Sequence, residues 1–134
     1  MAALPHESVY ARLAASDIHG VGVFAICAIP SGTEIFANDR MPIVWIGEAE
    51  VNRDLGAEHA RLYSDFGVRV HGKIGCPVNF NNLTTGWYLN QPPNGVEGNV
   101  RSDNELRFFS SRDIAEGEEL TIDYSQFAGL IEHG

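Results

Sequence analysis

Short stretches of alternating apolar and polar residues dominate the first part of the chain. Val9, Ala11 and Leu13 alternate with Tyr10 and Arg12, which is the period-two pattern of a half-buried strand. Turn-forming residues follow at positions 16–20, and the apolar run at positions 21–25 predicts a second strand. Because the two predicted strands are joined by a short turn, we expect them to form a hairpin.

The remaining pattern predicts further short strands and one region of a different kind. Residues 48–63 are rich in Ala, Glu, Arg and Leu and place Val51, Leu55 and Leu62 at roughly helical spacing, although Gly56 interrupts it. The other apolar runs are short and separated by loops rich in Asn, Gly and Pro. They predict strands at positions 34–36, 42–46, 68–70, 87–89, 106–110 and 120–123. The chain should therefore be mainly β, with one short helical region.

Length and composition add the expected domain organisation. The chain has 134 residues, and its 14 Gly and 6 Pro are scattered without a period, as in a fold with many turns. Neither a shift in composition nor an internal repeat marks a boundary. We therefore expect residues 1–134 to form a single domain.

The charge of the chain bears on its partners. Eighteen acidic and nine basic residues give a net charge of −9. Such a charge repels phosphate backbones and attracts basic peptides. Alternatively, it serves only to keep the protein soluble. The first sixteen residues lack a secretory leader, and the longest nearly apolar run, 21–29, is too short to span a membrane. We expect an intracellular, cytoplasmic protein that binds neither membranes nor nucleic acid directly.

Cysteine and histidine give no indication of a metal site. Cys27 and Cys76 are too few for a disulfide framework or a thiolate zinc site, and we expect both to be small buried residues. The five histidines stand far apart and show no short ligand spacing. No metal ion is predicted.

Three stretches, in a fixed order, resemble one known family. They are residues 20–25 with 29–35 behind them, then Trp87-Tyr88-Leu89-Asn90, and finally residues 107–124, RFFSSRDIAEGEELTIDY. Together, over about residues 9–127, they resemble the SET domain. Each stretch alone would be a weak signal, and their order and separation make the resemblance specific.

The resemblance implies a fold and an activity. The fold is one of small, curved β-sheets with a C-terminal pseudoknot, in which the last segment passes under a preceding loop. The activity is methylation of a protein lysine with S-adenosylmethionine as cofactor. A basic, histone-like or ribosomal protein would be the substrate, so that nuclear or nucleoid association could arise through it.

The resemblance also implies which residues bind the cofactor. Gly20 and Gly22, with Val21 between them, would let the backbone approach the cofactor closely, because glycine has no Cβ. The same glycines could instead serve only a tight turn. Asn90 carries a donor and an acceptor that suit it to fixing a loop and a cofactor together, and Gln91 would contribute through its backbone.

Catalysis and the substrate channel are expected near the end of the chain. The resemblance assigns catalysis to Tyr124, whose hydroxyl would face the reacting centre. Ile122 stands where related enzymes carry an aromatic group, and its smaller side chain favours multiple methylation. Tyr63 and Phe127 are candidates for the walls of the lysine channel, and equally for ordinary core aromatics.

The sequence departs from the family pattern in one loop. Gln91 and Pro92 stand where the family has His and Ser, and Pro92 offers neither a backbone N–H nor a hydroxyl. The loop closes either at Pro93-Asn94 or, in the longer alignment that we favour, at Asn99-Val100. These changes leave two alternatives open: a weak or inactive SET-type module that binds a protein partner, and a purely structural β-domain.

The expected channel also needs a wall beyond Tyr124. The family's lysine enzymes often carry a cysteine-rich zinc segment there, and this chain has none in its last ten residues. Phe127, Leu130 and Ile131, a second subunit in a homodimer, or the substrate itself could close the channel.

Overall fold

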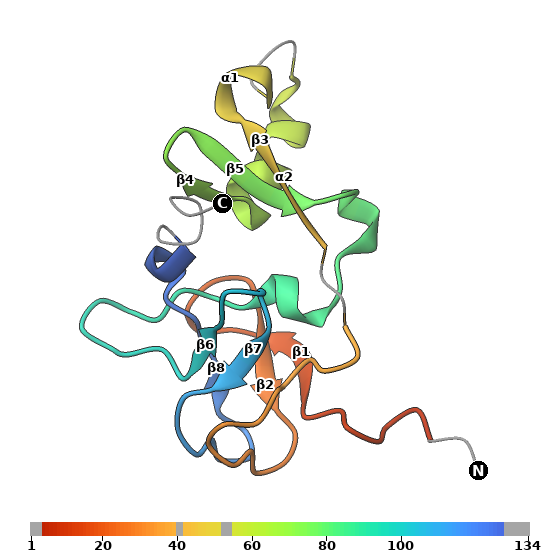
Figure 1. Cartoon of the computed structure of the whole chain (residues 1–134), viewed down its shortest axis with the longest axis vertical. Coiled ribbons are helices and arrows are strands. Elements are labelled where there is room, and N and C mark those ends of the chain that lie inside the picture. Colours follow the sequence, from red (N-terminus) through yellow and green to blue (C-terminus); the bar gives the residue numbers. More distant parts are fainter. Residues whose placement is uncertain (1–3, 40–41, 52–54, 128–134) are drawn as a thin grey trace. The chain divides into compact units, whose positions relative to one another are not determined.

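The computed structural model describes residues 4–39, 42–51 and 55–127, shown in Figure 1. Within these ranges the chain forms eight strands, two α-helices and three short 3-10 helices, labelled η. The strands are β1 Ala11–Ala15, β2 Val21–Ala25, β3 Ile43–Gly47, β4 Val68–Val70, β5 Lys73–Pro77, β6 Val100–Ser102, β7 Phe108–Ser110 and β8 Glu119–Leu120. The helices are α1 Glu48–Val51, α2 Ala57–Phe66, η1 Phe80–Asn82, η2 Thr85–Tyr88 and η3 Tyr124–Phe127. The fold is thus mainly β, with small sheets and one short helical region, as predicted.

The chain divides into two compact units. Unit 1 comprises the described residues up to 39 together with 88–123, and unit 2 comprises the described residues from 42 to 87 together with 124–127. Each unit has a three-stranded sheet of its own. The single domain over residues 1–134 stays a prediction.

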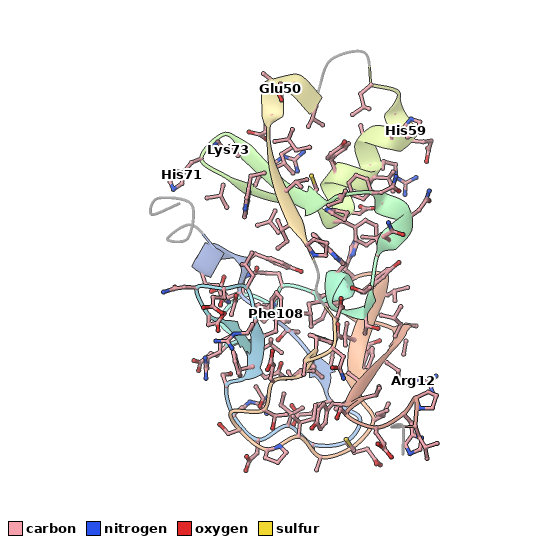
Figure 2. All side chains as sticks on the ribbon, turned by 45° about the vertical axis from the view of Figure 1, so that its right-hand side comes forward. Arg12, Glu50, His59, His71, Lys73 and Phe108 are labelled. Atoms are coloured by element: carbon pink, nitrogen blue, oxygen red, sulfur yellow. The ribbon has the colours of Figure 1, made fainter. Side chains whose placement is uncertain are left out.

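The sheet of unit 1 has the strand order β1-β2-β8. β1 and β2 form the expected antiparallel hairpin, with Ala11 opposite Ala25 and Ala15 opposite Val21. Its fully buried side chains, which exclude water from the sheet, are Val23, Leu120 and Ile122, and Ile29 and Ile114 add to the same core. The β6–β7 hairpin adds Phe108, whose side chain Figure 2 labels and which is also buried.

A loop closes around the segment that follows β8. The loop begins at Asn90, whose carbonyl accepts the N–H of Ile122 at 3.1 Å, and it ends at Val100, whose N–H donates to the carbonyl of Thr121 at 3.0 Å. The two ends of the loop therefore bond to two adjacent residues of the C-terminal segment. This arrangement is the C-terminal pseudoknot.

Asn99 fastens this crossing with its side chain. Its Oδ1 accepts the N–H of Thr121 at 2.8 Å and its Nδ2 donates to the carbonyl of Glu119 at 2.9 Å. Asn99 is only 3% exposed, whereas Asn94 lies exposed in a turn. The structure therefore favours the longer loop, which closes at Asn99-Val100.

The sheet of unit 2 has the strand order β3-β5-β4, with α1 and α2 in the helical region that the sequence predicts. Its central strand β5 was not predicted, because Gly75 and Pro77 are residues that weaken strands. Gly75 is required here, since an added Cβ would come within 3.0 Å of three atoms of the Trp45 indole. The ring of Trp45 thus packs directly on the backbone of the central strand.

Three other expectations need correction. Residues 87–89 are not a strand: the N–H of Trp87 bonds to the carbonyl of Thr84 at 3.0 Å, and the resulting 3-10 turn buries the indole. Residues 34–36 form only an isolated bridge at Glu34 before the chain turns. Cys76 is buried as expected, whereas Cys27 keeps part of its surface exposed.

Asn99 offers a direct test of the pseudoknot. Asn99→Leu keeps the size of the side chain and removes both hydrogen-bonding groups, leaving the buried N–H of Thr121 and the carbonyl of Glu119 without partners. We expect the free energy of unfolding in urea to fall by about 2–5 kcal/mol, because each orphaned buried group costs about 1–3 kcal/mol. The control, Asn94→Ala in the exposed turn, should cost about 0.5 kcal/mol or less. Equal losses for the two variants would contradict the longer loop.

Candidate functional site

The two glycines singled out in the sequence lie where the β1–β2 turn meets β2: Gly20 ends the turn, and Gly22 is the second residue of the strand. Ser16 organises this turn: its N–H donates to the carbonyl of Gly20 at 2.8 Å, and its Oγ accepts the N–H of Ile18 at 3.0 Å. Gly20 has φ +46°, in the left-handed region where glycine carries no steric cost. The turn chemistry of residues 16–20 therefore has a specific geometric reason.

Asn90 joins this turn to the rest of unit 1. Its Nδ2 lies 3.1 Å from the carbonyl oxygen of His19, 3.4 Å from that of Val21 and 2.9 Å from Oε2 of Glu119. The partners come from the β1–β2 turn and from β8, which are far apart in sequence. One side-chain amide thus ties together three stretches of the chain.

Glu119 lies at the centre of the same contacts. Its carboxylate accepts the hydroxyl of Ser16, with Oγ 2.8 Å from Oε1 and 2.9 Å from Oε2, as well as the Asn90 amide. Gly22 lies beneath it, because a Cβ built at Gly22 would collide with the carboxylate and lie 3.0 Å from Cβ of Ser16. We call Ser16, Gly22, Asn90 and Glu119 the Asn90 cluster.

The Asn90 cluster leaves one hydrogen-bonding atom open. Within the described part of the chain, no N–H or O–H donates to Oδ1 of Asn90, while its amide nitrogen is surrounded by acceptors. Asn90 is only half-buried, so that this oxygen can accept a hydrogen bond from a ligand. The cluster therefore has the chemistry of a binding site for a group that carries a donor.

The residues next to Asn90 are firmly tied to the C-terminal segment. The Gln91 side chain donates to Oδ1 of Asp123 at 3.1 Å, and Pro92 is buried. Ile122, expected at the substrate channel, has no exposed surface in unit 1. Its role in a channel stays a prediction.

Unit 2 holds a separate pocket of about 400 Å³ between β3, β5, α2 and η1. Tyr63 lies in its wall and packs edge-on against Phe80, with ring centroids 4.9 Å apart. His59 of α2, labelled in Figure 2, also lines the pocket, and among the described residues no Lys, Arg, Asp or Glu does. The pocket thus suits an uncharged group.

Tyr124 begins η3 in unit 2. Burial raises the pKa of its phenol well above the ordinary value of 10.0, although the residue as a whole keeps some exposed surface. The hydroxyl therefore stays protonated at any pH at which the protein would work. The side chain of Phe127 lies outside the described residues, so that its place in a channel stays a prediction.

The structure brings some of the predicted residues together and leaves others apart. Val21, Gly22 and Asn90 meet in unit 1, where Gln91 is the next residue along, and Gly20 lies in the same turn. The candidates Tyr63 and Tyr124 belong to unit 2. Ser16 was expected only as one of the turn residues 16–20, and Glu119 was not among the predicted site residues.

No helix among the described residues is long and apolar enough to cross a membrane. Nor do any three His, Cys, Asp or Glu side chains in the described ranges gather where they could hold a metal ion.

Comparison with known proteins identifies the family. A model of the SET domain matches residues 20–125. No curated protein matches the sequence. Among solved structures, one from Plasmodium falciparum described as a "putative histone methyltransferase" is similar, with a TM-score of 0.50 and 18% identity over 87% of this chain and 93% of the other. At that identity the likeness concerns the fold alone.

The close packing of Glu119 on Gly22 can be tested through stability. Gly22→Ala places a Cβ against the carboxylate and should cost about 1–3 kcal/mol of unfolding free energy, as overpacking does. Gly20→Asn is the matched control, because Asn tolerates the left-handed backbone and a Cβ at position 20 meets nothing within 4 Å. It should cost less than Gly22→Ala.

A double variant makes this test specific. Glu119→Ala removes the carboxylate, so that the loss for Gly22→Ala with Glu119→Ala should be smaller than the sum of the two single losses. Strict additivity in urea denaturation would contradict the contact between Gly22 and Glu119.

Proposed function

This chain belongs to the SET domain family, and on that basis we propose that it transfers methyl groups from S-adenosylmethionine to a lysine side chain of a basic protein. The family is one of protein-lysine methyltransferases. The cofactor, the substrate and the roles of individual residues are our inference for this chain.

One observation carries the proposal: the three stretches of the family signature meet at the side chain of Asn90. Its amide joins the end of the β1–β2 turn and the start of β2, which carry Gly20 and Gly22, to the loop that begins at Asn90 and the strand that begins at Glu119. The oxygen of that amide remains available to a donor, and S-adenosylmethionine offers amino and hydroxyl donors. The residues therefore fit the cofactor that the family uses.

Methyl transfer requires little acid–base catalysis from the protein. When bound, the cofactor would supply a methyl group carried on a positively charged sulfur. The lysine must first lose a proton from its ammonium group, whose ordinary pKa is about 10.4. The protein then contributes mainly by holding the reactants in line.

Tyr124 is the residue that we propose for the reacting centre. Because burial raises the pKa of its phenol, the side chain acts there as a neutral hydroxyl rather than as a base. Such an oxygen can accept weak hydrogen bonds from the methyl group and from the amine without being consumed. We further propose Tyr63, with Ile122 and Phe127, for the lysine channel.

The charge of the chain supports a basic substrate. The net charge is −9, and basic side chains such as Arg61, Arg69 and Arg112 are already paired with glutamates. Excess negative charge at the surface attracts a lysine-rich segment and speeds its encounter with the protein. A histone-like or ribosomal protein has this chemistry. We also propose that the protein locates with such a substrate in the cell and that a second subunit closes the lysine channel.

The altered loop keeps contacts that are compatible with the proposed activity. Gln91 replaces the family's His but ties its side chain to Asp123, directly before Tyr124. Pro92 is buried, so that it contributes packing where the family has a hydroxyl. An inactive SET-type module would keep the same contacts. Measuring cofactor binding distinguishes a SET-type protein that binds the cofactor from a purely structural β-domain that does not.

Binding of the demethylated cofactor is the first test. We expect S-adenosylhomocysteine to bind the purified protein with one site in isothermal titration calorimetry. Asn90→Ala should weaken binding by about tenfold or more, since it removes the acceptor and loosens the turn. Asn104→Ala, in the exposed β6–β7 turn, is the control and should bind as the parent does. No heat with the parent at millimolar ligand would refute the proposal.

The role of Tyr124 is tested by the rate of transfer. Tyr124→Phe should leave the fold and cofactor affinity intact and lower methyl transfer to a mixture of basic proteins by at least about tenfold, since the lost contact acts in the transition state. Tyr10→Phe, another phenol removed, should have the parent's rate. An unimpaired Tyr124→Phe enzyme would show that this tyrosine is structural.

The pH profile gives an independent check on the same residue. Because burial raises the pKa of Tyr124, its ionisation should not lower the rate at alkaline pH. The rate should rise up to about pH 9 to 10, as more substrate lysine becomes neutral. A fall in rate between pH 8 and about 9 that is absent in Tyr124→Phe would contradict a neutral phenol.

A further inference from the structure

The amide of Asn90 faces an excess of acceptors. Its two N–H groups lie within hydrogen-bonding distance of four oxygens: Oγ of Ser16, the carbonyls of His19 and Val21, and Oε2 of Glu119. An amide turned by 180° would place its own oxygen against these acceptors. The surroundings therefore fix which end of the side chain points at the turn and which end is left for a ligand.

Among the four acceptors, Glu119 is the only charged one. Its hydrogen bond to Nδ2 of Asn90 is 2.9 Å long and is charge-assisted, and such bonds are roughly twice as strong as neutral ones. No Lys, Arg or His in the described part of the chain forms an ion pair with Glu119. Its charge is thus not neutralised by a salt bridge and acts on the hydroxyl of Ser16 and the amide of Asn90.

The strand pairing explains why the carboxylate reaches Asn90. Glu119 lies opposite Phe24 in the β2–β8 ladder, while its neighbour Leu120 points into the core and is fully buried. Side chains alternate along a strand, so that Glu119 lies on the other face, diagonally across from Gly22. The missing side chain at Gly22 leaves the space in which the carboxylate lies.

From this geometry we propose that Glu119 is a positioning residue: its carboxylate holds the Asn90 amide with the N–H groups toward the β1–β2 turn and Oδ1 toward the cofactor. The proposal rests on the proposed function and goes beyond it. It assigns a role to a glutamate that makes no contact with the reacting atoms. It also gives Gly22 a second reason to be glycine, besides close approach of a ligand.

The test exchanges the polarity of the pair. Glu119→Gln keeps the size of the side chain but removes its charge and leaves a single acceptor oxygen, Oε1, in place of the two carboxylate oxygens that Asn90 and Ser16 share. We expect the affinity for S-adenosylhomocysteine to fall about fivefold to tenfold, as loss of one charge-assisted hydrogen bond would give. Asn90→Asp sets two carboxylates against each other and should weaken binding further.

The double variant distinguishes positioning from a general loss of structure. In Asn90→Asp with Glu119→Gln, the new NH₂ at position 119 can donate to one oxygen of the new carboxylate at position 90, and the other oxygen of that carboxylate remains an acceptor for the ligand. The double variant should therefore bind more tightly than Asn90→Asp alone. Glu116→Gln is the matched control, because Glu116 lies exposed in the turn before β8, outside the Asn90 cluster, and the affinity of this variant should equal that of the parent.

The outcomes separate this proposal from the proposed function. A parent that binds no cofactor would overturn both. A parent that binds, with Glu119→Gln binding equally well or the double variant no better than Asn90→Asp, would overturn the positioning role alone. Should Glu119→Gln melt well below the parent, Ser16→Ala serves in its place, because it removes another partner of the carboxylate, and Ser16 is only half-buried. It should weaken binding by about twofold to fivefold, and an unchanged affinity would again overturn the role.

Discussion

The C-terminal segment 119–122 has to satisfy its backbone without a long strand of its own, and much of unit 1 is arranged to meet this constraint. β8 contains only two residues, and just Val23 and Phe24 pair with it. The remaining groups of the segment bond to Asn90, to Val100 and to the side chain of Asn99. Because buried backbone groups without partners are costly, the loop that supplies these contacts cannot be moved without cost to the fold.

The same constraint positions the candidate site. Once Leu120 and Ile122 are buried, the alternation of side chains leaves Glu119 on the opposite face of the ladder, above Gly22. Asn90, whose carbonyl holds the segment, presents its amide to that carboxylate and to the β1–β2 turn. The pseudoknot and the Asn90 cluster are therefore one structure, in which backbone bonds hold the segment and side-chain bonds hold the turn.

Much of this could be predicted from sequence where one local signal sufficed. The β1–β2 hairpin was predicted, although Val9 and Leu13 of the alternating pattern are exposed and only Ala11 is buried. Composition predicted the helical region, and the order of the motifs predicted the family. β5 could not be predicted, because Gly75 weakens strand propensity and is explained only by the indole of Trp45 across the sheet. The strand predicted at residues 87–89 was wrong for the opposite reason. This aromatic run has high strand propensity, but Trp87 lies in a 3-10 turn that buries its ring.

The residues of the candidate site also differ in whether a local sequence signal could identify them. Asn90 could be identified from its motif, whereas Ser16 and Glu119 acquire their roles only when residues 103 positions apart meet. Gly22 shows the difference most clearly, because the sequence allows either a turn or close approach of a ligand, and the structure adds a carboxylate that fills the space. A glycine in such a motif can thus be required by the protein's own side chains, and its replacement would disturb the site even if no ligand ever touched its backbone.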